Sequence, residues 1–455
     1  MIAVLALGRA RAEPATGPAA AVDNLDWWAR HRLTRVNAAI LAGRSRPETL
    51  TGELNHSPLA TAPDPAGLPP RLARPLLTLL GLIGSSVALH AQQHDAVVRA
   101  EPARAFTGLA VTADRMPFRD YVTAVAEQAE PGHPGKDSFT TLVTWNVPTT
   151  RLVWQGRELA TRPGYFAEPA HTYTGDRGET SMLTLVKKAQ TFEEPANDAL
   201  LPIVRREIPP HGREAIERVR LARAMLDGLR SVFLEYFVPA DDGQLPLTVE
   251  HFMDVFRQFS VHWDTGDVPT SASQDAEQIR RDYYLGIDLR GYDQHIARVL
   301  PALLPAERRL VSEAMQLPSI PELVLSRLPR PAITVRSAAD VLALAREHPY
   351  VVEYHLLLQA HARAGSAHLG LAKQFLFNPM RERDRHGLPD AVVVSHRVGT
   401  TGTPERLLDE LTDGRRRHPL RFLARLPSRT LRTAAGVPAH QPSREQLLEC
   451  VRIDG

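Results

Sequence analysis

Apolar residues recur at helical spacing along much of the chain. The clearest example is a run in which apolar side chains stand three or four residues apart: Ile216, Val219, Ala222, Leu226, Leu229, Phe233 and Phe237. This spacing predicts one face of a helix that begins after Pro209-Pro210 and ends before Pro239. Comparable patterns predict helices over residues 23–41, 71–93, 248–262, 306–315, 338–347 and 350–377, and from residue 407 onward. We therefore expect an all-α fold.

Few segments alternate between apolar and polar residues in the way that strands do. Residues 140–146 fit either a short strand or a buried helix, residues 152–180 a loop that crosses between two lobes, and residues 264–278 a polar loop. The first 20 residues are rich in Ala, Gly, Pro and Arg, and we expect them to be disordered. The remainder predicts two lobes, a small N-terminal helical domain over 21–165 and a large C-terminal helical bundle over 166–455.

Composition excludes several classes of protein and partner. The longest apolar stretch, residues 76–89, is interrupted by glycine and serine and is too short to span a bilayer, so it predicts a buried core helix. The apolar start of the chain is too short for the core of a signal peptide. The 54 basic residues are interspersed among 52 acidic ones, and only the three arginines at 415–417 form a basic block. We expect a cytoplasmic protein that binds neither nucleic acid nor a membrane.

Known catalytic motifs are absent from the sequence. It has no P-loop, no His-Glu-x-x-His, no Gly-x-Ser-x-Gly and no dinucleotide-binding glycine set after a strand. The single cysteine, Cys450, excludes a disulfide framework, a thiolate zinc site and an iron–sulfur cluster. A bound redox metal would therefore need other ligands, and the chain carries 18 histidines.

One histidine, His368, stands on the predicted helix after Pro349 among small residues: Ala364, Gly365, Ala367, Gly370 and Ala372. Small side chains beside a histidine let a flat, bulky group approach the helix, as a porphyrin bound through its iron requires. Taken alone, the pattern fits an ordinary structural or surface histidine better than a ligand.

The residues that follow His368 form a longer pattern. The segment His368-Leu369-x-x-x-Lys373-x-Phe375-Leu376, followed by Gly-Thr-Thr-Gly-Thr at 399–403, resembles the haem-ligand segment of the indoleamine 2,3-dioxygenases. In that family a Gly-Thr-Gly-Gly-Thr loop follows the histidine segment and covers the active site. Here the third loop position is threonine, and the lysine falls one position early. Residues 367–372 are also similar to the pyrrolnitrin-pathway haem enzyme branch of the same superfamily.

Further blocks match the family in the same order. Residues 304–310 and 318–326 resemble its Pro-Pro-Ala-His-Arg segment and the Pro-Ser-Val-Arg-Glu-Phe-Val-Leu-Ser run that follows. Phe252-x-x-Val255-x-Arg257, ending in Trp263, resembles its aromatic–arginine distal helix, and residues 71–74 before an apolar helix have a counterpart too. The resemblance covers roughly residues 70–415.

The resemblance implies a haem b cofactor and the side chains that hold it. His368 would be the axial ligand of the haem iron, bound through a neutral imidazole. Arg363, five residues before it, would reach a haem propionate.

The resemblance also implies a substrate pocket on the distal side. Arg257 would pair with a substrate carboxylate, which suits the planar guanidinium fork. Phe252 and Phe256 would form the apolar wall around an aromatic substrate, and Thr400 would contact substrate from the closing loop. From the residues alone, Arg257 also fits a surface ion pair, and the two phenylalanines also fit the core.

The implied activity is that of a haem-dependent dioxygenase. It would insert dioxygen across the C2–C3 bond of the indole ring of tryptophan or a derivative, giving an N-formylkynurenine-type product, and would need an electron donor. The family's Gly-Gly-Ser-Ala-Gly-Gln-Ser stretch corresponds to residues 281–288 without the glycines, and its distal serine segment to residues near 182–186. Rearrangement or hydroxylation of another aromatic amino acid, a non-catalytic haem protein and a cofactor-free helical module stay open, as does the oligomeric state.

Overall fold

Helices make up most of the chain in a computed structural model, which describes residues 17–112, 114–237, 246–328, 337–438 and 442–454. The helical share is 64% and the strand share 4%, which confirms the predicted all-α class. The disorder expected for the first 20 residues falls mostly on residues 1–16, outside the described part. From Pro18 onward the chain is helical, so the first helix begins five residues earlier than residue 23.

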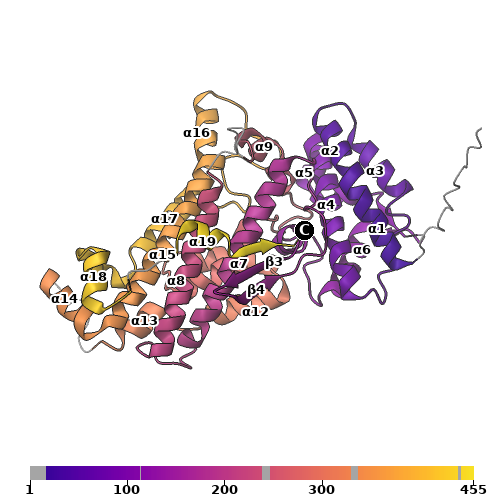
Figure 1. Cartoon of the computed structure of the whole chain (residues 1–455). Helices are drawn as coiled ribbons and strands as arrows, with labels where there is room; N and C mark the ends of the chain where they lie inside the picture. The colour runs from indigo at the N-terminus through magenta and orange to yellow at the C-terminus, as the bar shows by residue number, and fades with distance from the viewer. Residues whose placement is uncertain (1–16, 113, 238–245, 329–336, 439–441, 455) are drawn as a thin grey trace, which may run out of the picture.

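The N-terminal lobe, indigo to purple in Figure 1, is built around one long apolar helix. That helix, α4 (Pro70–His94), is long and apolar enough to span a membrane, but 89% of its most apolar window is buried within the protein. It is thus the core helix that the sequence predicts. The lobe comprises α1 (Pro18–Trp28), the π-helical η1 (Ala29–Leu33), α2 (Thr34–Leu41), α3 (Pro47–His56), α4 (Pro70–His94), α5 (Ala96–Ala100), η2 (Pro102–Phe106), β1 (Ala110–Val111), β2 (Met116–Pro117) and α6 (Phe118–Ala129).

The connection between the lobes carries regular structure that the sequence pattern did not predict. Residues 140–146, either strand or helix by pattern, form the buried π-helical η3 (Thr140–Trp145). The predicted loop 152–180 instead contains a hairpin of β3 (Thr150–Trp154) and β4 (Arg157–Arg162), closed at Gln155 and Gly156, both with positive φ. On its other side β3 pairs with β5 (Val451–Ile453), so the strand order is β4-β3-β5.

The C-terminal lobe packs its longest helices side by side, with shorter elements around them (Figure 1). The long helices are α7 (Arg177–Val204), α8 (Arg213–Glu235) and α15 (Pro349–Ala372), the last continued by the π-helical η8 (Lys373–Phe377). The shorter elements are α9 (Val249–Asp254), η4 (Phe256–Phe259), η5 (Ala272–Gln274), α10 (Ala276–Tyr284), α11 (Tyr292–Val299), η6 (Leu300–Ala302), α12 (Pro305–Ala314), α13 (Ile320–Leu325), α14 (Ala338–Glu347), α16 (Asn378–Arg385), α17 (Glu405–Arg416), η9 (Pro419–Arg425), α18 (Ser428–Ala435) and α19 (Arg444–Leu448).

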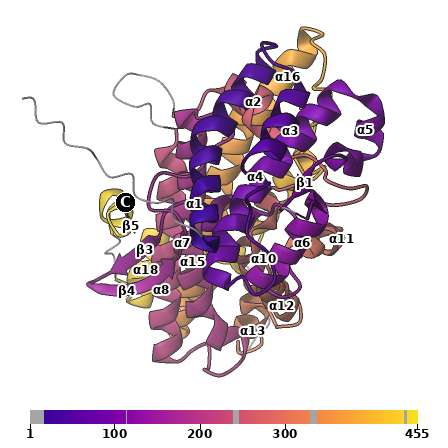
Figure 2. The ribbon, with the colours of Figure 1, turned by 90° about the vertical axis from the view of Figure 1, so that its right-hand side faces the viewer.

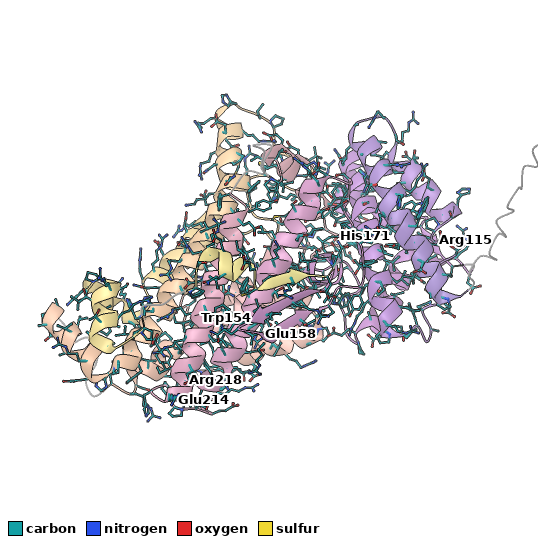
Figure 3. All side chains as sticks on the ribbon, viewed as in Figure 1. Arg115, Trp154, Glu158, His171, Glu214 and Arg218 are labelled. Atoms are coloured by element: carbon teal, nitrogen blue, oxygen red, sulfur yellow. The ribbon has the colours of Figure 1, made fainter. Side chains whose placement is uncertain are left out.

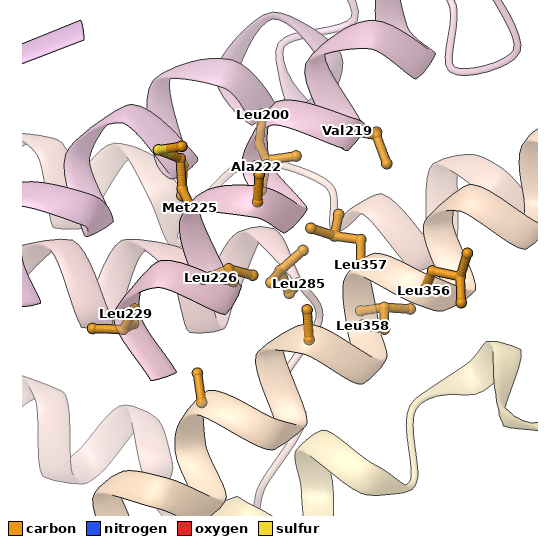
Figure 4. Close-up of a cluster of buried hydrophobic side chains, with 14 of the residues drawn as sticks. Leu200, Val219, Ala222, Met225, Leu226, Leu229, Leu285, Leu356, Leu357 and Leu358 are labelled. Atoms are coloured by element: carbon orange, nitrogen blue, oxygen red, sulfur yellow. The ribbon is translucent and has the colours of Figure 1, made fainter. Parts of the chain in front are cut away.

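The apolar face predicted on α8 is buried against α7 and α15. Val219, Leu226 and Leu229 are 0–1% exposed, and Figure 4 shows them with Leu200 and Leu357 from the neighbouring helices. At about 25 cal/mol per Å² of buried apolar surface, such side chains supply the main stabilisation of the bundle. This core fixes the position of α15, which carries His368.

The two lobes have separate hydrophobic cores. The boundary between these cores does not coincide with the predicted domain boundary after residue 165. Side chains of the hairpin pack into the C-terminal core, whereas Tyr173, Phe259 and Trp263 pack into the N-terminal one. Trp263 lies against Gly84 of α4, where an added Cβ would stand 2.2 Å from the indole ring. Figure 2 shows the N-terminal helices in front of the larger lobe, and Figure 3 shows His171 at the junction of the lobes.

Candidate functional site

A cavity lies where the N-terminal lobe meets the C-terminal helices. It encloses about 1340 Å³ of atom-free space, a volume that includes its open mouth. Its walls are mostly apolar: Phe139, Leu142, Val143, Met182, Leu183, Val186, Ile279, Ile296, Ala372, Leu376, Leu408 and Leu411. An apolar lining with a few polar groups is typical of a site for a small organic molecule or cofactor.

Five of the six predicted site residues line this one cavity. They are His368 from α15, Phe252 from α9, Phe256 and Arg257 from η4, and Thr400 from the loop before α17. These elements are far apart in the sequence, so it is the folded chain that brings them together.

His368 presents a neutral imidazole to the cavity. Its ring stacks on Phe233 with a centroid distance of 5.3 Å and an interplanar angle of 20°. Burial, reinforced by the nearby Arg415 guanidinium, lowers the pKa of His368 to about 4. Its ring nitrogens make no hydrogen bond to any residue that the structure describes. A neutral histidine without a protein partner, facing a cavity, is free to act as a metal ligand.

The small residues around His368 have a different role from the predicted one. A Cβ at Gly365 would stand 2.7 Å from a guanidinium nitrogen of Arg415, and one at Gly370 would stand 3.3 Å from the Phe237 ring. These two glycines therefore admit protein side chains and not a cofactor. Of the five small residues noted, Ala372 is the one that lines the cavity.

A buried ion pair holds the same face of α15 in place. Asp282 of α10 accepts hydrogen bonds from Arg415 at 3.0 and 2.7 Å and from the Tyr292 hydroxyl at 3.0 Å. Its carboxylate also lies 3.0 Å from Nε2 of His361, two turns before His368. Burial alone would raise the pKa of Asp282, but Arg415 and His361 hold it well below its usual range. The pair thus joins α10, α15 and α17 on this face.

Arg257 ties the closing loop to the cavity wall. Its guanidinium donates to the backbone carbonyl of Ser395 at 2.6 Å and to that of Val398. Burial lowers the pKa of Arg257 to about 10, so the group stays charged near neutral pH. Asp390 is the nearby carboxylate, but no carboxylate of the described residues forms an ion pair with Arg257, which lines the cavity.

The loop at 399–403 is a tight turn that contacts η5, another segment of the cavity lining. The Gly399 amide donates to the Thr403 carbonyl at 2.8 Å, and Gly402 has a φ of +72°, which favours glycine. The Thr401 hydroxyl lies 3.1 Å from that of Ser273 in η5. The loop therefore closes over the cavity with Thr400 on its wall.

Sequence reasoning missed residues 270–273, which are three hydroxyl-bearing residues and Ala272, and all four line the cavity. We expected the family's Gly-Gly-Ser-Ala-Gly-Gln-Ser stretch at 281–288, but residues 281–284 belong to α10 and bury the charged Arg281 and Asp282. The sequence signal that could have marked this segment is the run of small residues Thr-Ser-Ala-Ser shortly before α10. The segment near 182–186 does reach the cavity, through Met182, Leu183 and Val186.

Arg363 is the predicted site residue that lies elsewhere. Five residues along a helix turn it by about 140°, so Arg363 faces away from His368. It lines a separate surface pocket and pairs with Asp227 at 2.9 Å. Its expected contact with a propionate of a group bound at His368 does not fit this placement.

Among the described residues, no group of three or more His, Cys, Asp or Glu side chains gathers in a way that could hold a metal ion. A metal carried by a macrocycle needs a single protein ligand and no such group. No protein-family model and no curated protein matches the chain.

Proposed function

We propose that the protein is a haem-dependent oxygenase that acts on the indole ring of tryptophan or a tryptophan derivative. The observation that carries this proposal is a neutral His368, without a hydrogen-bond partner among the described residues, facing a large apolar cavity that also contains a buried arginine. The ordered resemblance of residues 70–415 to the indoleamine 2,3-dioxygenases points to the same chemistry.

The cavity residues fit a haem group. His368 would provide the axial ligand, and the apolar side chains of Ala372, Ile296, Leu408 and Leu411 would pack against the macrocycle. Arg363 is not part of this set, since it lines another pocket. When bound, haem supplies an iron centre that activates dioxygen for insertion into an electron-rich ring.

The remaining residues suit an aromatic amino acid. Phe252 and Phe256 lie with ring centroids 6.4 Å apart and offer a wall for a flat indole. Arg257 would bind the substrate carboxylate through the part of its guanidinium that the loop carbonyls leave free. Because Arg257 also holds residues 395 and 398, substrate binding would tighten the loop that carries Thr400 and exclude water from the ring.

Turnover of L-tryptophan by the haem-reconstituted protein, in air with a chemical reductant, tests the proposal. Mass spectrometry of the products should detect tryptophan with two added oxygen atoms, both derived from labelled dioxygen. One added oxygen atom would contradict ring cleavage and support hydroxylation, and an unchanged elemental composition would support rearrangement. A haem-loaded protein that consumes no indole compound would contradict an enzymatic role altogether.

A further inference from the structure

A second pocket lies on the face of α15 that points away from His368. It encloses about 1180 Å³ of atom-free space including open solvent, and is bounded by α8, α15, the end of α17 and η9. The side chains that matter are four arginines and two histidines: Arg230, Arg363, Arg416, Arg421, His355 and His418. No carboxylate lines the pocket among the described residues.

The arginines around this pocket are only partly neutralised. Arg363 pairs with Asp227 at 2.9 Å, and Arg416 lies 3.6 Å from Asp413 while donating to the Ser366 hydroxyl at 3.0 Å. Arg230 and Arg421 form no ion pair or hydrogen bond through their side chains with any described residue. Two unpaired guanidinium groups facing one concavity produce a positive potential that favours an anion.

Helices α8 and α17, which both border the pocket, carry paired arginines away from it. Arg213 at the start of α8 lies 2.9 Å from Glu217, and Arg406 near the start of α17 lies 2.6 Å from Glu410. Pairing within one helix neutralises these two arginines. Arg230 and Arg421 at the pocket have no such partner among the described residues.

The two histidines of the pocket are buried and lie close together. His355 and His418 are 1% and 7% exposed, and their ring centroids lie 5.3 Å apart. The Nδ1 atom of His418 is buried without a hydrogen-bond partner. Burial lowers the pKa of His355 to about 3 and that of His418 to about 4, so both are neutral near pH 7. Buried polar atoms in native proteins are nearly always hydrogen-bonded, so a ligand or bound water would be expected here.

We propose that this arginine pocket binds a small, multiply charged oxyanion of the phosphate-ester class. The guanidinium fork matches a phosphate group in a bidentate manner, and phosphate presents enough oxygens for several forks at once. Leu234, Ala362 and Ala424 supply apolar wall for the organic part of such a molecule. The proposal is independent of the oxygenase function, because none of these residues lines the cavity at His368.

Calorimetric titration of the full chain with pyrophosphate tests this site. We expect saturable binding at one site, weakened by about tenfold or more in Arg230→Gln/Arg421→Gln, because each lost guanidinium removes charge-assisted hydrogen bonds. The matched control, Arg213→Gln/Arg406→Gln, removes the same charge from α8 and from α17, outside the pocket, and should bind within about twofold of the parent. Equal weakening in both double variants would overturn the proposal, as would the absence of binding to the parent protein.

Two further measurements keep the test decisive if the double variant folds poorly. Pyrophosphate should protect Arg230 and Arg421 of the parent protein from phenylglyoxal, with Arg213 as the unprotected reference in the same digest. Equal modification with and without pyrophosphate would overturn the site. An oligoglutamate peptide that binds the pocket more tightly than pyrophosphate would assign it to an acidic protein segment and would also contradict the proposal.

Discussion

Helix α15 has one face toward the apolar cavity and another toward the arginine pocket, and this difference explains which of its residues belong to the candidate site. One face carries His361, Gly365, His368 and Ala372 at spacings of four, three and four residues, and it borders the apolar cavity and the buried Asp282–Arg415 pair. The other carries His355, Gln359, Arg363 and Ser366, and it borders the polar pocket with four arginines. Neighbours in sequence such as Ala367 and His368 thus line different sites, so closeness along a helix is a poor guide to a shared function.

The largest loss of stability should come from removing the carboxylate of Asp282, which pairs with Arg415 beside the cavity face of α15. Asp282→Ala leaves the buried Arg415 without its partner, which should lower the free energy of unfolding by about 3–5 kcal/mol. Asp413→Ala, which removes the exposed partner of Arg417, should cost less than about 1 kcal/mol. Urea unfolding of both variants measures the difference, and equal losses would mean that the buried pair does not hold this face.

Acidification should lower the free energy of unfolding, because both faces of α15 border histidines that are buried in the neutral form. Burial lowers the pKa of His361 and of His418 to about 4, whereas the unfolded value is about 6.5. The unfolded chain therefore binds more protons, and stability is present above pH 6.5 and lost as the pH falls toward 4. Each such histidine contributes a slope of about 1.4 kcal/mol per pH unit. Urea unfolding between pH 7 and 5 should reveal this decline; a constant free energy would contradict the burial of neutral histidines.

Filling the space beside Arg415 should have a smaller effect. In Gly365→Ala the new Cβ would meet the Arg415 side chain at 2.7–2.9 Å, and displacing that side chain should cost about 1–3 kcal/mol. Gly414→Ala in α17 meets nothing within 4 Å and should be neutral or stabilising by up to about 1 kcal/mol. Thermal unfolding compares the two variants, and a neutral Gly365→Ala would show that Arg415 does not depend on this close approach.

Replacing Arg257 should weaken the binding only of ligands that carry a carboxylate. Arg257→Ala should weaken the binding of L-tryptophan by about tenfold, from loss of a charge-assisted carboxylate contact. Tryptamine, which lacks the carboxylate, should bind both proteins with similar affinity, and titrations of the haem-loaded protein with each ligand measure this. Equal weakening for both ligands would mean that Arg257 acts only by holding the loop carbonyls.

Sequence periodicity was sufficient for the parts of the fold in which one helix face is buried. The α8 face and the core helix α4 follow from residues three and four apart, because local spacing determines which side chains share a face. The hairpin at 150–162 was missed because its pattern is weak and its partner strand β5 lies nearly 300 residues later in the chain. Tertiary pairing of that kind leaves little local signal.

The sequence predicted which residues line the candidate site, but it did not predict the contacts that connect them. His368, Phe252, Phe256, Arg257 and Thr400 stand in motifs whose order alone indicates a common site. Arg257 donates hydrogen bonds to two carbonyls of a distant loop, and the Arg415 side chain packs closely against Gly365. Both contacts depend on how elements far apart in the sequence pack together. Arg363 was assigned from its nearness to His368, which the turn of the helix makes misleading.

The most direct measurement compares the absorption spectra of two α15 variants after haem reconstitution. The account predicts that His368→Ala loses the Soret band of the histidine-ligated parent, while Arg363→Ala on the opposite face retains it unchanged. His295→Ala, which removes the other histidine of the cavity wall, should also retain it. An unchanged histidine-ligated spectrum in His368→Ala would contradict the central claim that the cavity face of α15 holds the haem.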